Sequence, residues 1–113
     1  MPDTPKHIID QLAALGQESR FRVFRRLMKA GPDGIPAGQL ASELDILPNT
    51  LSTHLGILSR TGLVSARRDG RTLYYSADIE SVSGMVEGIV ADCCNGNPDL
   101  CKSLQTSKVL QCG

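Results

Sequence analysis

Residues 48–76 read PNTLSTHLGILSRTGLVSARRDGRTLYYS, and this stretch decides the fold. Its first half has the periodicity of a helix with one buried face, and its leading proline is tolerated in the first turn of a helix. Its second half contains two strand-like runs separated by Asp69-Gly70. Asp-Gly between such runs is a strong signal for a β-hairpin, because both turn residues need a positive φ. The leucines expected to face inward are Leu51, Leu55 and Leu58.

A shorter helix is predicted before this stretch, over about residues 37–44. Residues 45–47 make a tight connection between the two helices. Two short helices joined by a turn of three or four residues form a helix–turn–helix, the second helix of which enters the DNA major groove. The sequence therefore predicts a helix–turn–helix over residues 37–61 and a basic wing over residues 63–76. The inward positions of the shorter helix are Leu40, Ala41 and Leu44.

Two more helices are predicted upstream. The first begins near His7 and leaves residues 1–5 as a flexible tail, and the second covers about residues 18–30. The run Gly31-Pro32-Asp33-Gly34 stops the second helix, because glycine and proline break helices and favour turns. The expected core positions are Ile8, Leu12 and Leu15 in the first helix, and Phe21, Val23, Phe24, Leu27 and Met28 in the second.

A last helix is predicted over residues 78–94, with Asp78 as its N-cap. Its apolar residues recur at alternating spacings of three and four, which suits helix packing across a dimer. We therefore expect a single domain over residues 1–113, mainly α with a β-hairpin wing (α+β). This winged helix–turn–helix would dimerise through its first and last helices. The apolar positions of the last helix are Ile79, Val82, Val86, Ile89 and Cys93.

The charges are unevenly distributed along a chain whose formal net charge is zero. Residues 49–76 carry four arginines and one aspartate, whereas residues 78–101 carry five acidic residues and no lysine or arginine. Such a chain can offer one face to phosphate and another to a cation. No apolar run approaches the length of a membrane span and the N-terminus has no apolar signal-peptide core, so a cytoplasmic protein without a membrane partner is expected.

The candidate DNA contacts lie at the start of the second helix of the pair and around the tip of the hairpin. Short polar groups at a helix N-terminus can reach base edges, and asparagine can bond adenine through two hydrogen bonds. Solvated polar positions and a charge-protected edge strand are the alternative interpretations. His54 could also be a core histidine or a metal ligand. The predicted contacts are Asn49, Thr50, Ser52, Thr53, His54, Arg67, Arg68 and Arg71.

The four cysteines are clustered at Cys93, Cys94, Cys101 and Cys112. Such clustering indicates metal binding or redox chemistry rather than a disulfide scaffold. The turn-forming residues 95–98 allow Cys101 to approach the adjacent pair. Three thiolates without a fourth ligand suit As(III) or Sb(III). We place this metalloid site at the end of the last helix and in the C-terminal tail, residues 95–113. Cys112 as a fourth ligand would instead favour Cd(II), Pb(II) or Zn(II), and a redox switch is the rival interpretation.

The sequence resembles the ArsR/SmtB family of bacterial metal-sensing repressors. The resemblance covers residues 7–93 and is carried by ALGQESRFRVF at residues 14–24, LSTHLGILSRTGLV at residues 51–64 and RDGRTLYY at residues 68–75. It implies a homodimer that binds an imperfectly palindromic operator and is released when the effector binds. The family's Cys-x-Cys arsenic site before the recognition helix is missing, because residues 40–45 read LASELD. The cysteines at 93, 94 and 101 are similar to a relocated three-thiol arsenite site of some family members.

An enzyme is not expected. The chain has no phosphate-binding loop, nucleophile elbow or HExxH motif, and its only histidines are His7 and His54. A thiol reductase would use Cys-x-x-Cys, which is also missing. The sequence therefore predicts a DNA-binding repressor of a metal or metalloid resistance operon. Methylarsenite, Cd(II), Pb(II) and thiol oxidation are the alternative signals for the same repressor. A cytosolic thiol redox protein is the less favoured function.

Overall fold

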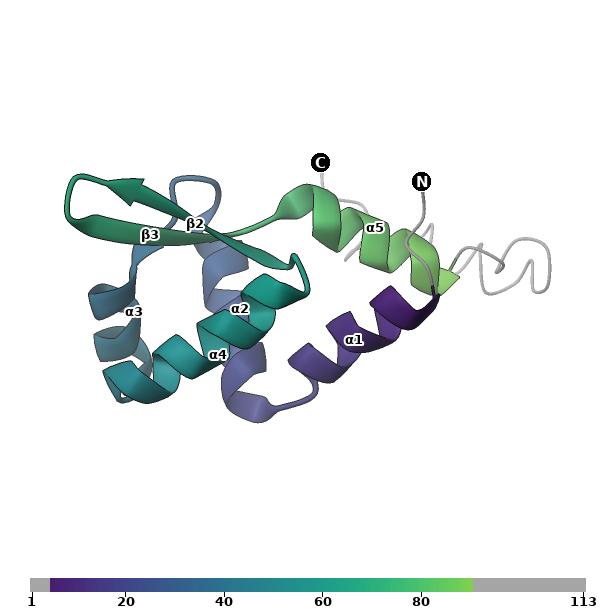
Figure 1. Cartoon of the computed structure of the whole chain (residues 1–113), viewed down its shortest axis with the longest axis horizontal. Helices are drawn as coiled ribbons and strands as arrows, with labels where there is room; N and C mark the ends of the chain where they lie inside the picture. Colours follow the sequence, from purple (N-terminus) through teal and green to yellow (C-terminus); the bar gives the residue numbers. More distant parts are fainter. Residues whose placement is uncertain (1–4, 91–113) are drawn as a thin grey trace.

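The computed structural model describes residues 5–90 of the chain. Five helices and three short strands make one layered domain, with α2 behind α4 and the β-hairpin extending from one side (Figure 1). No helix in this range is long and apolar enough to cross a membrane. The elements are α1 Pro5–Leu15, α2 Glu18–Ala30, β1 Ile35–Pro36, α3 Ala37–Leu44, α4 Pro48–Arg60, β2 Val64–Asp69, β3 Thr72–Ala77 and α5 Ile79–Val90.

The helix ends follow the local chemistry of the sequence. The side chain of Gln17 accepts a hydrogen bond from the Arg20 backbone N–H at 2.8 Å and caps α2. Gly31, with a φ of 82°, closes the same helix. Asp78 accepts from the Ser81 N–H at 3.1 Å, which confirms it as the N-cap of α5. The first helix begins at Pro5 rather than His7, because proline has no N–H to lose at a helix start.

The core forms where α2 and α4 face each other and pack against the sheet. Val23 and Leu27 of α2 and Leu58 of α4 are fully buried. Each buried leucine contributes roughly 1.5–3 kcal/mol through the hydrophobic effect. The inward positions predicted for the helix–turn–helix are confirmed, except that Leu44 is only partly buried. The core of the described residues also includes Ile8, Ala14, Phe24, Ile35, Leu40, Ala41, Leu51, Leu55, Leu63, Val64, Ala77 and Met85.

Three residues predicted for the core are instead exposed. Leu12 of α1 is 45% exposed, and Phe21 and Met28 of α2 are 43% and 38% exposed. Helical periodicity shows which side of a helix is apolar, but it does not show which part of that side another element covers. In α1 the covered positions are Ile8, Gln11 and Ala14, so the buried line lies beside the predicted one.

The sheet contains the predicted hairpin and one strand that the sequence did not reveal. Its order is β1-β3-β2, and both pairings are antiparallel. β1 gives almost no sequence signal because it has two residues and one is Pro36, which only an edge strand tolerates. Gly34 precedes it with a φ of 79°, and a Cβ there would lie 2.7 Å from the Tyr75 carbonyl oxygen. Glycine at this position is therefore what allows β1 to pair with β3.

The hairpin turn lies one residue later than predicted. Asp69 is the last residue of β2 and pairs with Thr72, so the two-residue turn is Gly70-Arg71. Among the described residues other than glycine, only Asp45 has a positive φ, which shows that Asp69 does not adopt the conformation we expected. Gly70, with a φ of 64°, alone supplies the left-handed residue of this turn.

The helices α1 and α5 lie side by side at one end of the molecule, away from α3 (Figure 1). A Cβ at Gly88 would overlap the Ile8 side chain, so these helices approach closely at that point. α5 is described only as far as Val90, and residues 91–94 of the predicted last helix lie outside the described range.

Candidate nucleic-acid interface

The helix–turn–helix is closed by a left-handed residue. Asp45 ends α3 with φ 54° and ψ 49°, a conformation that aspartate tolerates better than most residues. The Ile46 N–H then donates to the Ala41 carbonyl oxygen at 3.0 Å, and its side chain packs against the core. Residues 45–47 therefore form the predicted tight connection, and they set α4 at a defined angle to α3.

The first two turns of the outer face of α4 carry short side chains, and exposed Arg60 ends the helix. Asn49, Ser52 and Thr53 are all exposed and lie within about one helical turn of each other, with exposed Gly56 continuing the same face. A Cβ at Gly56 would meet no atom within 4 Å, so the protein itself does not require glycine there. Thr50 is exposed as well. Four of the five residues predicted for base contact are therefore accessible.

His54 corrects the fifth of these predictions. Its exposed fraction is 8%, and its Nδ1 has no hydrogen-bond partner among the described residues. Burial lowers the pKa of this imidazole below its usual 6.5, and the positive charge of Arg20 lowers the pKa further. His54 lies three residues after Leu51 and four before Leu58, on the buried side of α4. That spacing in the sequence could have identified it as a core histidine, and a buried side chain does not reach a base edge.

The three wing arginines are not equivalent. Arg67 donates through Nη2 to the Asp33 carbonyl oxygen at 3.0 Å, and its guanidinium lies 4.8 Å from the centre of the Tyr74 ring. Its Nη1 is also 4.0 Å from an Asp69 carboxylate oxygen. Arg67 therefore attaches the hairpin to the turn after α2, a role that the sequence did not indicate.

Arg68 and Arg71 remain available at the end of the hairpin. Both are exposed, and neither has a hydrogen bond or ion pair among residues 5–90. A guanidinium in this situation can bind a phosphate through two parallel hydrogen bonds. The hairpin therefore presents two uncommitted cations, while Arg67, which pairs with Tyr74 in the middle of the hairpin, anchors it to the turn after α2.

An apolar surface lies at the other end of the molecule, on α1 and α5. Two neighbouring helices contribute exposed apolar side chains to it, and such a grouping marks an interaction site. We call these five residues the end face. They are Ile9 at 63% exposure, Leu12 at 45%, Ile79 at 53%, Val86 at 37% and Ile89 at 53%.

The predicted effector residues Cys93, Cys94 and Cys101, together with Cys112, lie outside the described residues. Within residues 5–90 there is no group of three or more histidine, cysteine or acidic side chains that could hold a metal ion. The predicted three-thiol site therefore stays a prediction that rests on the sequence.

Comparison with known proteins agrees with this geometry. A family model described as a helix–turn–helix domain matches residues 15–66. The transcriptional activator HlyU of Vibrio cholerae is 30% identical over 86 residues, which are 76% of this chain and 77% of HlyU. A structure described as a possible transcriptional regulator for arsenical resistance is 26% identical, with a TM-score of 0.64, and the match covers 83% of this chain and 95% of that one.

An ArsR-like transcriptional regulator from Rhodococcus sp. RHA1 matches with a TM-score of 0.74 at 22% identity, over 90% of this chain and 93% of that one. The fold and the exposed α4 define a DNA-binding transcriptional regulator of the winged helix–turn–helix class. The chain belongs to the ArsR family of such regulators. HlyU is described as a regulator of transcription, which agrees with the expectation of a protein that is not an enzyme.

Proposed function

We propose that this chain is a homodimeric repressor that binds operator DNA and releases it when As(III) or Sb(III) binds to cysteines near its C-terminus. The observation that carries the DNA-binding part is the outer face of α4, where Asn49, Ser52 and Thr53 are exposed. Placed in the major groove, these groups would contact base edges. Arg68 and Arg71 would bind phosphates beside the groove.

The dimer is supported by the end face. A partner chain that packs its own α1 and α5 against this surface would bury five apolar residues that one chain leaves exposed. A two-fold dimer of this kind repeats α4 on both halves, so the operator should be an imperfect palindrome with half-sites about 34 Å apart. One solved neighbour in the same fold class is described as a homodimeric winged helix–turn–helix domain from Mycobacterium bovis.

The effector site is proposed from the chemistry of the donors. Thiolates are soft ligands that select soft ions, and Cys93, Cys94 and Cys101 provide three of them within nine residues of sequence. Cys93 follows the last described residue of α5 by three positions. An ion bound there would act first on the dimer helix, and it would release DNA by favouring the state that binds DNA poorly.

The direction of regulation is also part of the proposal. HlyU is described as an activator, whereas a relative from Agrobacterium fabrum, 33% identical over 57 residues, is described as a repressor. The fold therefore accommodates both outcomes. We favour repression for this chain. A repressor that an effector releases from the operator allows the operon to be transcribed, and this mechanism needs no contact between the regulator and RNA polymerase.

The test is operator release measured by fluorescence anisotropy while As(III), Sb(III), methylarsenite, Cd(II), Pb(II), Zn(II) or an oxidant is added in separate titrations. We expect release by As(III), and we expect Cys93→Ser, Cys94→Ser and Cys101→Ser to keep operator affinity but lose this response. Cys112→Ser is the matched control and should respond like the natural protein. Normal As(III) release from all three variants would refute the site, and release by the oxidant alone would replace metalloid sensing with a redox switch.

A further inference from the structure

The outer side of α2 carries a cluster of basic residues that neither the core nor the reading face uses. Arg22, Arg25, Arg26 and Lys29 follow each other at the spacing of one helix face. Together with Leu44 they line a shallow hollow of about 270 Å3, and none of its lining residues is acidic. We call these four residues the α2 basic face.

Three of the four positive charges are not neutralised within the described chain. Arg26 is paired with Glu43, with 2.9 Å between Nε and Oε2. Arg22 donates to the Leu44 carbonyl oxygen at 3.1 Å, which holds the side chain in place and leaves its charge intact. Arg25 lies over the Phe21 ring at 5.7 Å. Lys29 has no hydrogen bond or ion pair among residues 5–90.

The arrangement costs helix stability. Like charges separated by three or four residues on a helix are destabilising by about 0.2–0.5 kcal/mol per pair. The α2 basic face contains two such pairs between charges that no carboxylate neutralises, Arg22 with Arg25 and Arg25 with Lys29. On α1 the exposed Lys6 is paired with Asp10, whereas Arg22, Arg25 and Lys29 have no such partner among the described residues. An anionic ligand would convert the repulsion into binding.

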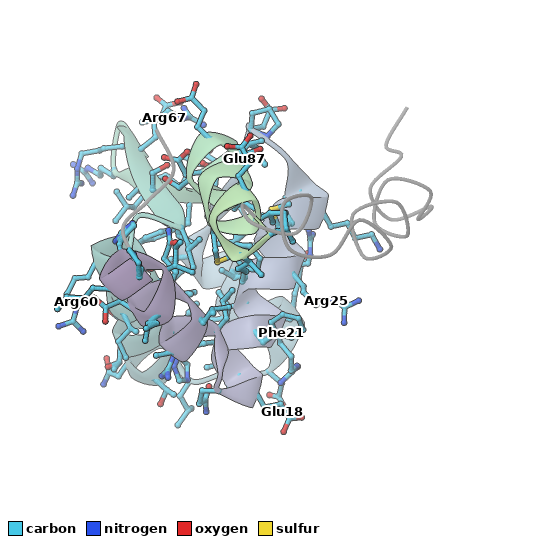
Figure 2. The ribbon with its side chains drawn as sticks, turned by 90° about the vertical axis from the view of Figure 1, so that its right-hand side faces the viewer. Glu18, Phe21, Arg25, Arg60, Arg67 and Glu87 are labelled. Carbon is cyan, nitrogen blue, oxygen red and sulfur yellow. The ribbon has the colours of Figure 1, made fainter. Side chains whose placement is uncertain are left out.

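The α2 basic face points away from the surface that reads the operator. Figure 2 shows Arg60, at the end of α4, and Arg25, on α2, projecting from opposite sides of the domain. A duplex lying along the Arg60 side of α4 would have Arg25 on the opposite side of the domain. A ligand for this face is therefore a different molecule, or a different stretch of the same DNA.

We propose that the α2 basic face is a second DNA-binding surface, which takes the phosphodiester backbone of a DNA segment other than the one read by α4. The inference rests on the proposed function. Residues 22 and 29 are seven positions apart, so the row is about 10 Å long. Duplex DNA carries about six phosphate charges over that length. Fixed guanidinium groups such as that of Arg22 bind phosphate through paired hydrogen bonds. A dimer would present two such faces and could hold two DNA segments together.

The experiment uses two short duplexes with different fluorophores, one containing the operator and one of unrelated sequence. The full chain is bound to the first duplex, and capture of the second is followed by energy transfer at several salt concentrations. We expect capture by the natural protein, with a salt slope of about 0.9 for each phosphate that the α2 basic face neutralises. The variant R25E/K29E should lose capture at least tenfold while binding the operator duplex with unchanged affinity.

The matched control is R25K/K29R, which exchanges the two side chains but keeps their charges and should retain capture. Thermal melting of each variant verifies that it is folded. Equal capture by R25E/K29E, or no capture by a natural protein that binds the operator, would overturn the second surface. An equal loss of operator affinity in R25E/K29E would place this face on the operator itself and also overturn it. Failure of the natural protein to bind any operator would instead overturn the proposed function.

Discussion

The helices α4 and α5 have nearly the same length, 13 and 12 residues, and both carry an apolar stripe. In α4 the stripe is covered, since Leu51, Leu55 and Leu58 are at most 2% exposed. In α5 only Met85 is buried, while Ile79 and Ile89 are each 53% exposed. The described residues complete the packing of the reading helix, whereas they leave the apolar stripe of α5 exposed, as the proposed dimer requires. The predictions below test that contrast.

The largest effect is expected in the covered stripe. Leu58→Ala leaves a cavity at a fully buried position and should lower the free energy of unfolding by about 2–5 kcal/mol. Leu47→Ala is the matched control, because Leu47 is 75% exposed next to the same helix and its truncation should change stability by no more than about 0.5 kcal/mol. Urea denaturation of both variants measures the difference, and equal losses would contradict the packing of α4.

A smaller effect, on association, is expected in the exposed stripe. Ile89→Asp should weaken the dimer tenfold or more, because burial of an isoleucine contributes about 1.5–3 kcal/mol and each 1.4 kcal/mol is a factor of ten. Glu80→Asp places an aspartate at an exposed acidic position of α5, about 100° around the helix from Ile79, and should leave the dimer intact. Sedimentation velocity over a concentration series gives both constants. A dimer that tolerates Ile89→Asp would mean that the end face is not its interface.

The wing arginines allow the same comparison between side chains that the protein engages and side chains that it leaves available. Arg68→Ala and Arg71→Ala should weaken binding by similar factors on all DNA sequences and reduce the salt slope by roughly 0.9 for each phosphate that is no longer neutralised. Arg67→Ala should change the slope less, because its guanidinium is engaged by Asp33 and Tyr74. Operator binding measured between low and physiological salt separates the three. An unchanged slope in the Arg68 and Arg71 variants would remove the wing from the interface.

The smallest effect concerns His54 on the buried side of α4. Its pKa is lowered in the folded protein by burial and by Arg20, so the folded state binds fewer protons than the unfolded state as the pH falls below about 6.5. Stability is therefore full above that pH and is lost as the pH falls toward the lowered pKa. His54→Gln should flatten this dependence in denaturation series from pH 5 to pH 8. Identical pH profiles for the two proteins would show that His54 does not contribute.

The reading half of the chain was largely predictable. The order of elements and the N-cap Asp78 follow from short-range rules of spacing and capping, and the structure confirms them. Two details did not follow. The turn is Gly70-Arg71 because strand pairing extends to Asp69, and β1 forms because Ile35 pairs with Tyr75 of β3. Both depend on which residues of distant segments lie opposite each other.

The candidate site was predictable only in part, for the same reason. Exposure of Asn49, Ser52 and Thr53 follows from the position of the leucines between them. The burial of His54 and the engagement of Arg67 by the Asp33 carbonyl oxygen depend on contacts outside the local segment. Residue type alone does not distinguish a histidine or arginine that binds a ligand from one that holds the fold.

The sequence by itself determined the helices, the hairpin, the family resemblance and the cluster of cysteines after residue 90, because periodicity, turn chemistry and ligand type are local properties. Tertiary structure decided which apolar stripe is covered, which arginines remain available and where the basic side of α2 points. Those features depend on how elements distant in sequence pack together. A helix has the same apolar periodicity whether or not its own chain covers its apolar face. Only the packing of the tertiary structure therefore distinguishes the covered face of α4 from the exposed face of α5.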